Sequence, residues 1–325
     1  MSDPTRASSS TTAATGPVDA PLPLSGRAST IEHGPYRAEI AGVGATLRAL
    51  THDGRDLVVP FGVDEVRPLY RGALLAPWPN RVVDGLYDDQ GVERQLPITE
   101  VERGHALHGL VQWAEWDVEH HTPDRVVLAT RLAPSDGYPY RLDLRVEYRL
   151  DDDGLHTTVL ASNAAAGRAP YGVAPHPYLV AGEGRVDDWT LTLAADGYLE
   201  VTDDRLVPLG VHGVSERDGF DFRDGRLIGD LFVDHAFTDV AAAAGGRHEA
   251  RVTTADGTGV RMSWGRELPW VQVHTGDRPE PEDDRRGLAV EPMTCPPDAF
   301  TSGVDLVHLG PGESHEASWS IAAIV

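Results

Sequence analysis

An unbroken alternation of polar and apolar residues over residues 141–150 constrains the fold more than any other feature of the chain. The apolar residues occupy every second position: Leu142, Leu144, Val146, Tyr148 and Leu150. Successive side chains of a strand point to opposite faces, so this pattern predicts a half-buried antiparallel strand. The Asp-Asp-Asp-Gly sequence at 151–154 predicts a turn, and residues 155–163 predict the returning strand.

Further strands are predicted along the whole chain. Turn sequences at Thr122-Pro-Asp124, His52-Asp-Gly54 and Ala255-Asp-Gly257 each separate two strand-like segments. The remaining strand-like segments are 116–121, 125–132, 188–193 and 316–325. Long amphipathic helices are absent, and 34 glycines and 24 prolines interrupt the chain at short intervals. The chain is therefore expected to be all-β, a large antiparallel β-sandwich of two stacked sheets.

The domain organisation is expected to be simple. Residues 1–26 are rich in Ser, Thr, Ala and Pro, which predicts a disordered tail. No linker or internal repeat follows, so residues 27–325 are expected to form one β-sandwich domain. The sequence does not predict an oligomeric state.

Composition excludes several classes of function. All 28 basic residues are arginine, which excludes a Schiff-base lysine, a pyridoxal-phosphate lysine and a P-loop lysine. The net charge of −23 argues against nucleic acid and anionic membranes as partners.

The chain has one cysteine, Cys295, so no intrachain disulfide can form. A reducing compartment follows as the simpler expectation, and we predict a cytoplasmic protein. The N-terminal residues lack the pattern of a signal peptide, and no apolar run of about 18 residues is present. Cys295 itself is expected to be a small apolar filler beside Pro296.

His176 lies between Pro175 and Pro177 in an apolar segment. The prolines fix the local backbone, and the surroundings partly remove water from the imidazole. Histidine titrates near neutral pH, so a rigidly aimed, half-buried histidine is a candidate proton donor or acceptor. The alternative is a core histidine that bonds to a backbone carbonyl.

Glu291 follows the apolar residues Leu288, Ala289 and Val290, which predict a short buried strand that Pro292 ends. A carboxylate in an apolar interior needs a partner. Burial raises its pKa and makes it a better base near neutral pH. A buried Glu–Arg ion pair is the competing interpretation.

Other segments add polar groups in apolar or turn settings. Arg81, after a rigid Pro-Trp-Pro-Asn, is a candidate bidentate clamp on an oxygen-rich ligand. The additional candidates are Asn80, His105, His108, Asp234, Gln272 and His274. Carboxylates, amides and imidazoles next to aromatic residues are typical of carbohydrate sites.

Five of these segments, in this order, resemble the aldose 1-epimerase (galactose mutarotase) family. They are Asn80-Arg81, Leu107-His108-Gly109, Pro175-His176-Pro177-Tyr178, Asp234-His-Ala-Phe237 and Val290-Glu291-Pro292. The resemblance covers about residues 30 to 325. The Pro-Trp-Pro before Asn80 and the Met-Thr-Cys-Pro-Pro after Pro292 look closest to a bacterial subgroup that includes sulfoquinovose mutarotase-like proteins.

The resemblance implies a galactose mutarotase-like supersandwich and an isomerase that interconverts the α and β anomers of a free aldose. It implies that His176 is the general acid and Glu291 the general base. It makes Arg81, His108, Asp234, Asn80 and Tyr178 substrate-binding residues. It implies a small monosaccharide as partner, and no metal and no organic cofactor. Which sugar is bound, and whether it is phosphorylated, stays open.

Four alternatives remain at this point. A sugar-phosphate epimerase of the same fold would need an extra basic cluster, for which Arg278, Arg285 and Arg286 are available, although their loop reads as solvated surface. A non-catalytic carbohydrate-binding protein would keep the fold alone. A glycosidase or lyase would typically use two carboxylates. A metal site from His105, His108, His176 and Glu291 is disfavoured, because residues three apart on a strand face opposite sides.

Overall fold

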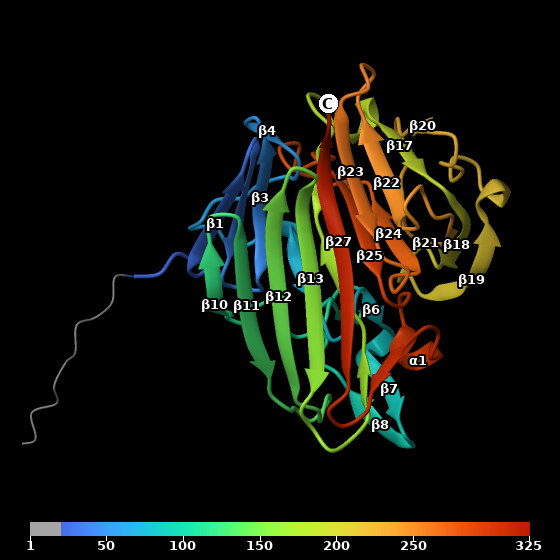
Figure 1. Ribbon diagram of the computed structural model, residues 1–325. Coiled ribbons are helices and arrows are strands. Elements are labelled where there is room, and N and C mark those ends of the chain that lie inside the picture. Colours follow the sequence, from blue (N-terminus) through green and yellow to red (C-terminus); the bar gives the residue numbers. More distant parts are fainter. Residues whose placement is uncertain (1–20) are drawn as a thin grey trace, which may run out of the picture.

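Two layers of antiparallel β-sheet build the protein in the computed structural model, which describes residues 21–325 (Figure 1). One layer is a nine-stranded sheet. Its strands, in spatial order, are β10 (Asp117–Thr122), β11 (Arg125–Leu132), β12 (Leu142–Asp151), β13 (Gly154–Asn163), β27 (Ser314–Ile324), β23 (Gly259–Trp264), β22 (His248–Thr253), β17 (Thr190–Leu193) and β20 (Arg226–Leu227).

The other layer consists of a four-stranded and a six-stranded sheet. The smaller sheet contains β1 (Ala28–His33), β2 (Tyr36–Ala41), β3 (Thr46–His52) and β4 (Arg55–Asp56). The larger has the order β16 (Tyr178–Leu179), β25 (Leu288–Met293), β24 (Trp270–His274), β21 (Asp234–Val240), β18 (Ala195–Val201) and β19 (Pro208–Gly213). The smaller sheet contacts β11, β12 and β13, and Figure 1 shows the larger one behind the orange and red strands of the nine-stranded sheet.

Short elements connect the layers. The two-stranded pairs are β5 (Ala73–Leu75) with β15 (Ala174–His176), β6 (Arg81–Val82) with β9 (Ala106–Leu107), β7 (Leu86–Asp89) with β8 (Val92–Gln95), and β14 (Ala169–Tyr171) with β26 (Val307–Leu309). The 3₁₀ turns are η1 (Pro68–Tyr70), η2 (Val83–Gly85), η3 (Val186–Asp188) and η4 (Val214–Glu216). Within residues 21–325 the sole α-helix is α1 (Ala299–Ser302).

The all-β sandwich predicted from the sequence is confirmed. Strands β12 and β13 pair in register from Leu142 with Asn163 to Asp151 with Gly154. Every apolar residue of the alternating β12 segment is buried in the main hydrophobic core. The turn sequences at 52–54, 122–124 and 255–257 each join two antiparallel strands as expected.

One strand boundary was wrong. Pro292 does not end β25, which continues to Met293 with Pro292 opposite Val271 of β24. The amides of Val290 and Thr294 donate to the carbonyls of Pro177 and Val173, on the side away from β24. By alternation, the position of residue 292 also faces away from β24, so a proline there removes no β24–β25 hydrogen bond.

Most of the tail predicted over residues 1–26 lies outside the described residues, which begin at residue 21. Ser25 is hydrogen-bonded to two loops of the domain. Its amide donates to the carbonyl of Val63 at 3.0 Å, and its carbonyl accepts from the amide of Val43 at 3.0 Å. No helix in the described part of the chain combines the length and apolar character needed to cross a membrane.

Replacing Leu144 with alanine tests the assignment of the β12 faces. Leu144 is buried in the core, so L144A is expected to lower the free energy of unfolding by about 2–5 kcal/mol. The adjacent Arg145 is exposed and pairs with the exposed Glu119, so R145A should cost less than about 1 kcal/mol. Urea unfolding of the two variants measures the difference, and equal losses would contradict the assigned faces.

Candidate active site

A cavity of about 540 Å³ lies on the side of the six-stranded sheet that faces away from the sandwich core. Val271, Val273 and Val290 point into the main core, whereas the alternate residues of the same strands line the cavity. The polar cavity-lining side chains include Tyr70, Asn80, Arg81, Glu100, Arg103, His108, His176, Tyr178, Asp234, Gln272, His274, Asp277, Arg278 and Glu291. Successive side chains of a strand point to opposite faces of the sheet, so the same strands line the core on one face and the cavity on the other.

Strand register brings the central side chains together. Gln272 of β24 lies opposite Glu291 of β25, and His274 lies opposite Asp234 of β21. The Gln272 amide donates to Asp234 Oδ1 at 2.7 Å. Residues from three strands thus form two adjacent rows on one face of the sheet.

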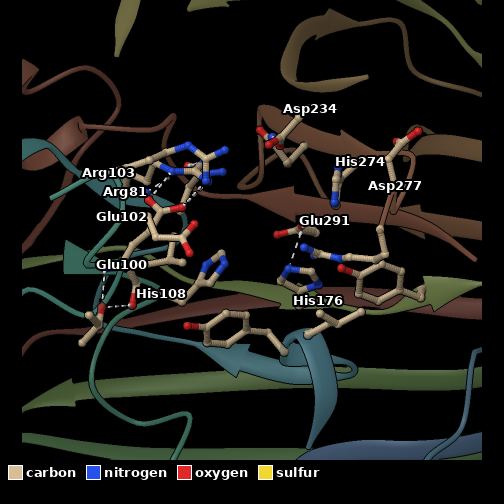
Figure 2. Close-up of a pocket in the computed structure, with 18 of the residues that line it drawn as sticks. Arg81, Glu100, Glu102, Arg103, His108, His176, Asp234, His274, Asp277 and Glu291 are labelled. Carbon is tan, nitrogen blue, oxygen red and sulfur yellow. Dashed lines mark hydrogen bonds and ion pairs between the residues drawn. The ribbon is translucent and has the colours of Figure 1, made fainter. Parts of the chain in front are cut away.

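His176 and Glu291 meet at this face, as shown in Figure 2. His176 ends β15, which pairs with β5, and its Nε2 lies 3.5 Å from Glu291 Oε1. The residues are 5% and 2% exposed, respectively. The structure therefore places the two sequence-predicted proton-transfer residues in contact, and His176 is more deeply buried than expected.

Burial moves the two pKa values in opposite directions. Desolvation, with smaller effects from His274 and Arg67, lowers the pKa of His176 to about 3. Desolvation, followed by the nearby charge of Asp234, raises the pKa of Glu291 well above its ordinary value. Both shifts favour the uncharged side chains. His176 is therefore a neutral imidazole, and the one titratable proton of the pair lies on the carboxyl of Glu291.

Asp234 behaves differently from Glu291 although both are buried. Burial alone would raise the pKa of Asp234, but the charges of His274 and Arg81 and the hydrogen bond from Gln272 lower it. One carboxyl of the cavity is therefore held ionised and the other protonated. Two carboxyls with separated pKa values are typical of sites that transfer protons.

The fork of Arg81, expected as a candidate clamp on a ligand, is engaged by Glu100. Its Nε and Nη2 donate to the two carboxylate oxygens of Glu100 at 2.8 and 2.9 Å, and Nη1 donates to Asn80 Oδ1 at 3.2 Å. Burial would raise the pKa of Glu100, but the hydrogen bonds and charge of Arg81 lower it. The bidentate geometry is thus satisfied within the protein, and only the remaining N–H groups of Arg81 are available to a ligand.

His108 lies on the wall of the cavity opposite Glu291 (Figure 2), and Asn80 also lines the cavity. Desolvation, then the proximity of His176 and Arg81, lowers the pKa of His108 well below its ordinary value. The amide of His108 donates to the Asn80 carbonyl at 2.8 Å. Both residues have positive φ angles, 64° and 52°, a conformation that costs energy outside glycine.

Several residues that line the cavity carry a buried polar atom without a partner. These atoms include His108 Nδ1, His176 Nδ1, Gln272 Oε1 and Glu291 Oε2. An unpaired buried donor or acceptor costs free energy, and a ligand that carries several hydroxyl groups would satisfy such atoms. His274 Nδ1 lies 3.3 Å from the Val233 carbonyl, which can only accept, so Nδ1 is the donor.

All seven residues named as catalytic or substrate-binding line this single cavity. His105 does not: its Nε2 donates to the Arg205 carbonyl, and its Nδ1 accepts from the amide of Asp84. Across residues 21–325 no group of three or more His, Cys, Asp or Glu side chains is arranged to hold a metal ion. Cys295 is buried, and desolvation raises its thiol pKa to about 12, as suits an apolar filler.

Sequence reasoning missed Tyr70 and Glu100. It named Gln272 and His274 only as additional candidates, and it offered Arg278 only for a sugar-phosphate epimerase. Gln272 and His274 occupy every second position after Trp270, so all three lie on one face of the strand. This spacing could have predicted that Gln272 and His274 belong to the site. No local pattern signals Glu100, because its position depends on the 99–103 loop folding beside Arg81. Arg278 lines the cavity although its acidic, proline-containing loop reads as solvated surface.

Comparison with known proteins finds a family model that matches nearly the whole chain. A family profile described as aldose 1-epimerase matches residues 27–322. The chain is 37% identical to the uncharacterized Escherichia coli K12 protein YihR over 298 residues, which is 91% of this chain and 93% of YihR.

Solved structures share the fold. A GalM/aldose epimerase homologue from C. elegans superposes with a TM-score of 0.79 at 21% identity, covering 92% of this chain and 100% of that one. A galactose 1-epimerase from Lactobacillus acidophilus NCFM gives a TM-score of 0.76 at 20% identity, covering 91% and 93%.

Replacing Glu291 with glutamine tests the protonation of the pair through protein stability. Because the folded-state pKa of Glu291 is raised, its contribution is fully present below the unfolded-state pKa of about 4.3. It is then lost, at about 1.4 kcal/mol per pH unit, as the pH rises toward the folded-state pKa. E291Q cannot lose a proton, so its stability relative to wild type should increase as the pH rises from 4.5 toward the folded-state pKa of Glu291.

Denaturant unfolding of both proteins across this pH range measures the effect. The matched control is E93Q, because Glu93 is exposed on β8. A stability difference between E291Q and wild type that stays constant with pH would show that Glu291 is already ionised in the folded protein.

Proposed function

The chain belongs to the aldose 1-epimerase family, and on this premise we propose that it interconverts the α and β anomers of an aldose by opening and closing the sugar ring. One observation carries the proposal: His176 and Glu291 form a buried pair, 3.5 Å apart, in a polar cavity lined by unpaired hydrogen-bonding atoms. Such a pair can give one proton and take one proton on the same ligand.

The reaction needs only these two transfers. A base removes the proton of the anomeric hydroxyl, the C1–O1 bond becomes a carbonyl, and the C1–O5 bond breaks. An acid protonates O5, which leaves the open-chain aldehyde. Rotation about C1–C2 presents the other carbonyl face, and the reverse transfers close the ring as the other anomer.

We assign the base to Glu291 and the acid to His176. Ring opening in this direction converts an ionised Glu291 and a protonated His176 into a protonated Glu291 and a neutral His176. Burial favours this uncharged state, so the dry site stabilises the bound aldehyde relative to the bound ring. The proton must move from Glu291 to His176 when the sugar binds, and hydrogen bonds from sugar hydroxyls to the carboxylate support that move.

The other sequence-predicted residues are assigned to the sugar hydroxyls. Asp234 is ionised and accepts hydrogen bonds, and its orientation is fixed by Gln272. The remaining N–H groups of Arg81, the Asn80 side chain, the unpaired His108 Nδ1 and the Tyr178 hydroxyl supply the other contacts. Arg81 and His108 lie across the cavity from Glu291 (Figure 2), so the two sides can hold a ring between them.

A second candidate substrate class is an aldose with an anionic substituent, such as a phosphate or sulfonate. The guanidinium of Arg278 lines the cavity, its Nε is buried without a partner, and it forms none of the ion pairs found in residues 21–325. Burial raises the pKa of Tyr178 to about 12, and the positive charge of Arg278 offsets part of this rise. An arginine that hydrogen-bonds to a tyrosine but has no ion-pair partner suits an anionic group.

The E291Q variant tests the reaction. Loss of the base should lower the anomer-exchange rate by about 10²–10⁴-fold while sugar binding remains measurable, because the glutamine keeps the shape of the side chain. Polarimetry or exchange NMR across hexoses, pentoses, sugar phosphates and sulfoquinovose measures the rate. E102Q is the matched control, since Glu102 is exposed at the cavity mouth.

Unchanged exchange in E291Q would refute the assignment of the base. Sugar binding by the wild type without any anomer exchange would favour a non-catalytic carbohydrate-binding protein instead. A cytoplasmic location remains a prediction from cysteine content.

Replacing Arg278 with methionine tests the second substrate class. R278M removes the charge and keeps the unbranched stem of the side chain, so KM for an anionic aldose should rise by about 10–100-fold. KM for a neutral aldose should change by less than about 3-fold. A similar loss for both classes would mean that Arg278 supports the cavity wall instead of binding an anion.

A further inference from the structure

The segment 67–72 crosses one side of the cavity and is fixed at both ends. At the start, the buried Arg67 donates to Thr46 Oγ1 at 2.6 Å and to the Gln112 carbonyl at 2.7 Å, and its guanidinium lies 4.2 Å from the centre of the Trp113 ring. At the end, the buried Arg71 pairs with Asp283 at 2.6 Å. We call residues 67–72 the arginine strap.

The end of the arginine strap is tied to His176. The Gly72 amide donates to the His176 carbonyl at 2.8 Å, and the Gly72 carbonyl accepts from the Leu47 amide at 3.0 Å. Gly72 has a φ of 68°, and a Cβ at this position would lie 1.9 Å from the Leu47 carbonyl oxygen. The strap therefore cannot shift at this end without moving the backbone of His176.

Between these anchors the backbone is strained. Leu69 and Tyr70 are consecutive non-glycine residues with φ angles of 52° and 57°. Such conformations cost free energy and persist where the surrounding contacts enforce them, often beside functional groups. Both residues line the cavity, so the strain lies at the site.

The strained conformation directs the Tyr70 ring onto two histidines. Its centre lies 4.6 Å from that of His108, at an interplanar angle of 65°, and 6.1 Å from that of His176, at 28°. The rings of His108 and His176 are 5.1 Å apart. His176 also stacks with Tyr178, at 5.3 Å. Two tyrosine rings therefore lie against the imidazole of His176.

We propose that Tyr70, held by the arginine strap, is a positioning residue that fixes the His176 imidazole against Glu291 and keeps water away from it. The proposal deepens the function proposed above and rests on it for the kinetic prediction. Tyr70 acts here through His176, and its planar ring is the part that matters. The hydroxyl of Tyr70 is not required.

Several groups face His176 and contribute to its protonation. They are Tyr70, His108, Tyr178, Asp234, His274 and Glu291. The charge of Arg67 in the strap also disfavours the imidazolium. Among these influences desolvation is the largest, and the Tyr70 ring supplies part of it. Removing the ring should therefore raise the pKa of His176 toward its ordinary value.

Substitutions of Tyr70 separate the role of its ring from the role of its hydroxyl. Y70F keeps the planar ring, whereas Y70L keeps much of the bulk and loses the flat face. Y70A removes the side chain altogether, in case the leucine of Y70L excludes water as well as the tyrosine ring does. Imidazole NMR of the full-length protein follows His176 without any need for substrate. In wild type and Y70F the ring should stay neutral from about pH 8 to about pH 5, and in Y70L or Y70A it should begin to titrate within this range.

Anomer exchange provides the second measurement. We expect kcat to fall by about 10-fold or more in Y70L and Y70A, with a smaller change in KM, and Y70F to stay within about 3-fold of wild type. The control is Y36L, because Tyr36 makes a comparable edge contact with His52, at 4.7 Å, outside the cavity. Y36L should leave both the His176 titration and kcat unchanged.

An unchanged His176 titration in both Y70L and Y70A would overturn the proposal. A loss of kcat in Y70F equal to that in Y70L would also overturn it, because the hydroxyl would then be the important group. If no aldose is turned over by the wild type, the proposed function fails, and the NMR titration alone still decides the role of Tyr70.

Discussion

Burial of one proton-sharing pair is the constraint on which the rest of the site depends. His176 and Glu291 are 3.5 Å apart and almost inaccessible to water, so each is driven toward its uncharged form. The surrounding polar groups are largely paired with one another: Arg81 with Glu100, and Asp234 with Gln272. These paired groups place fixed charges around His176 and Glu291 but do not form ion pairs with either residue. The single proton shared by His176 and Glu291 can therefore be transferred by way of a bound ligand.

The sheet makes this arrangement possible. Strands β21, β24 and β25 send apolar side chains into the sandwich core and polar ones into the cavity, so the burial that stabilises the fold also fixes the site. The arginine strap and the β15–β5 pairing then close the cavity over His176. The candidate site thus lies on the outer face of a sheet whose inner face packs in the hydrophobic core.

The sequence predicts the sandwich because alternation in segments such as β12 is a local property. It also identifies His176 and Glu291, since each stands out against an apolar neighbourhood, and the ordered resemblance supplies the remaining five residues. The Glu100 partner of Arg81 and the place of Tyr70 against His176 could not be predicted, because they arise from loops that meet only in the folded chain. The prediction that Pro292 ends the strand failed for a related reason. A proline disrupts a strand only where its position would have to donate a hydrogen bond to the neighbouring strand, and the side that the position faces is known only in the folded chain.

The pH dependence of kcat/KM for anomer exchange tests the central claim most directly, since it reports the protonation of the free enzyme. Two groups with ordinary pKa values would give a narrow maximum between about pH 4.3 and about pH 6.5, with activity falling through neutrality. The buried pair predicts instead a broad plateau through neutral pH, with its acid limb near pH 3 and its alkaline limb well above the usual range of a glutamate. A narrow maximum near pH 5.5 would contradict the account.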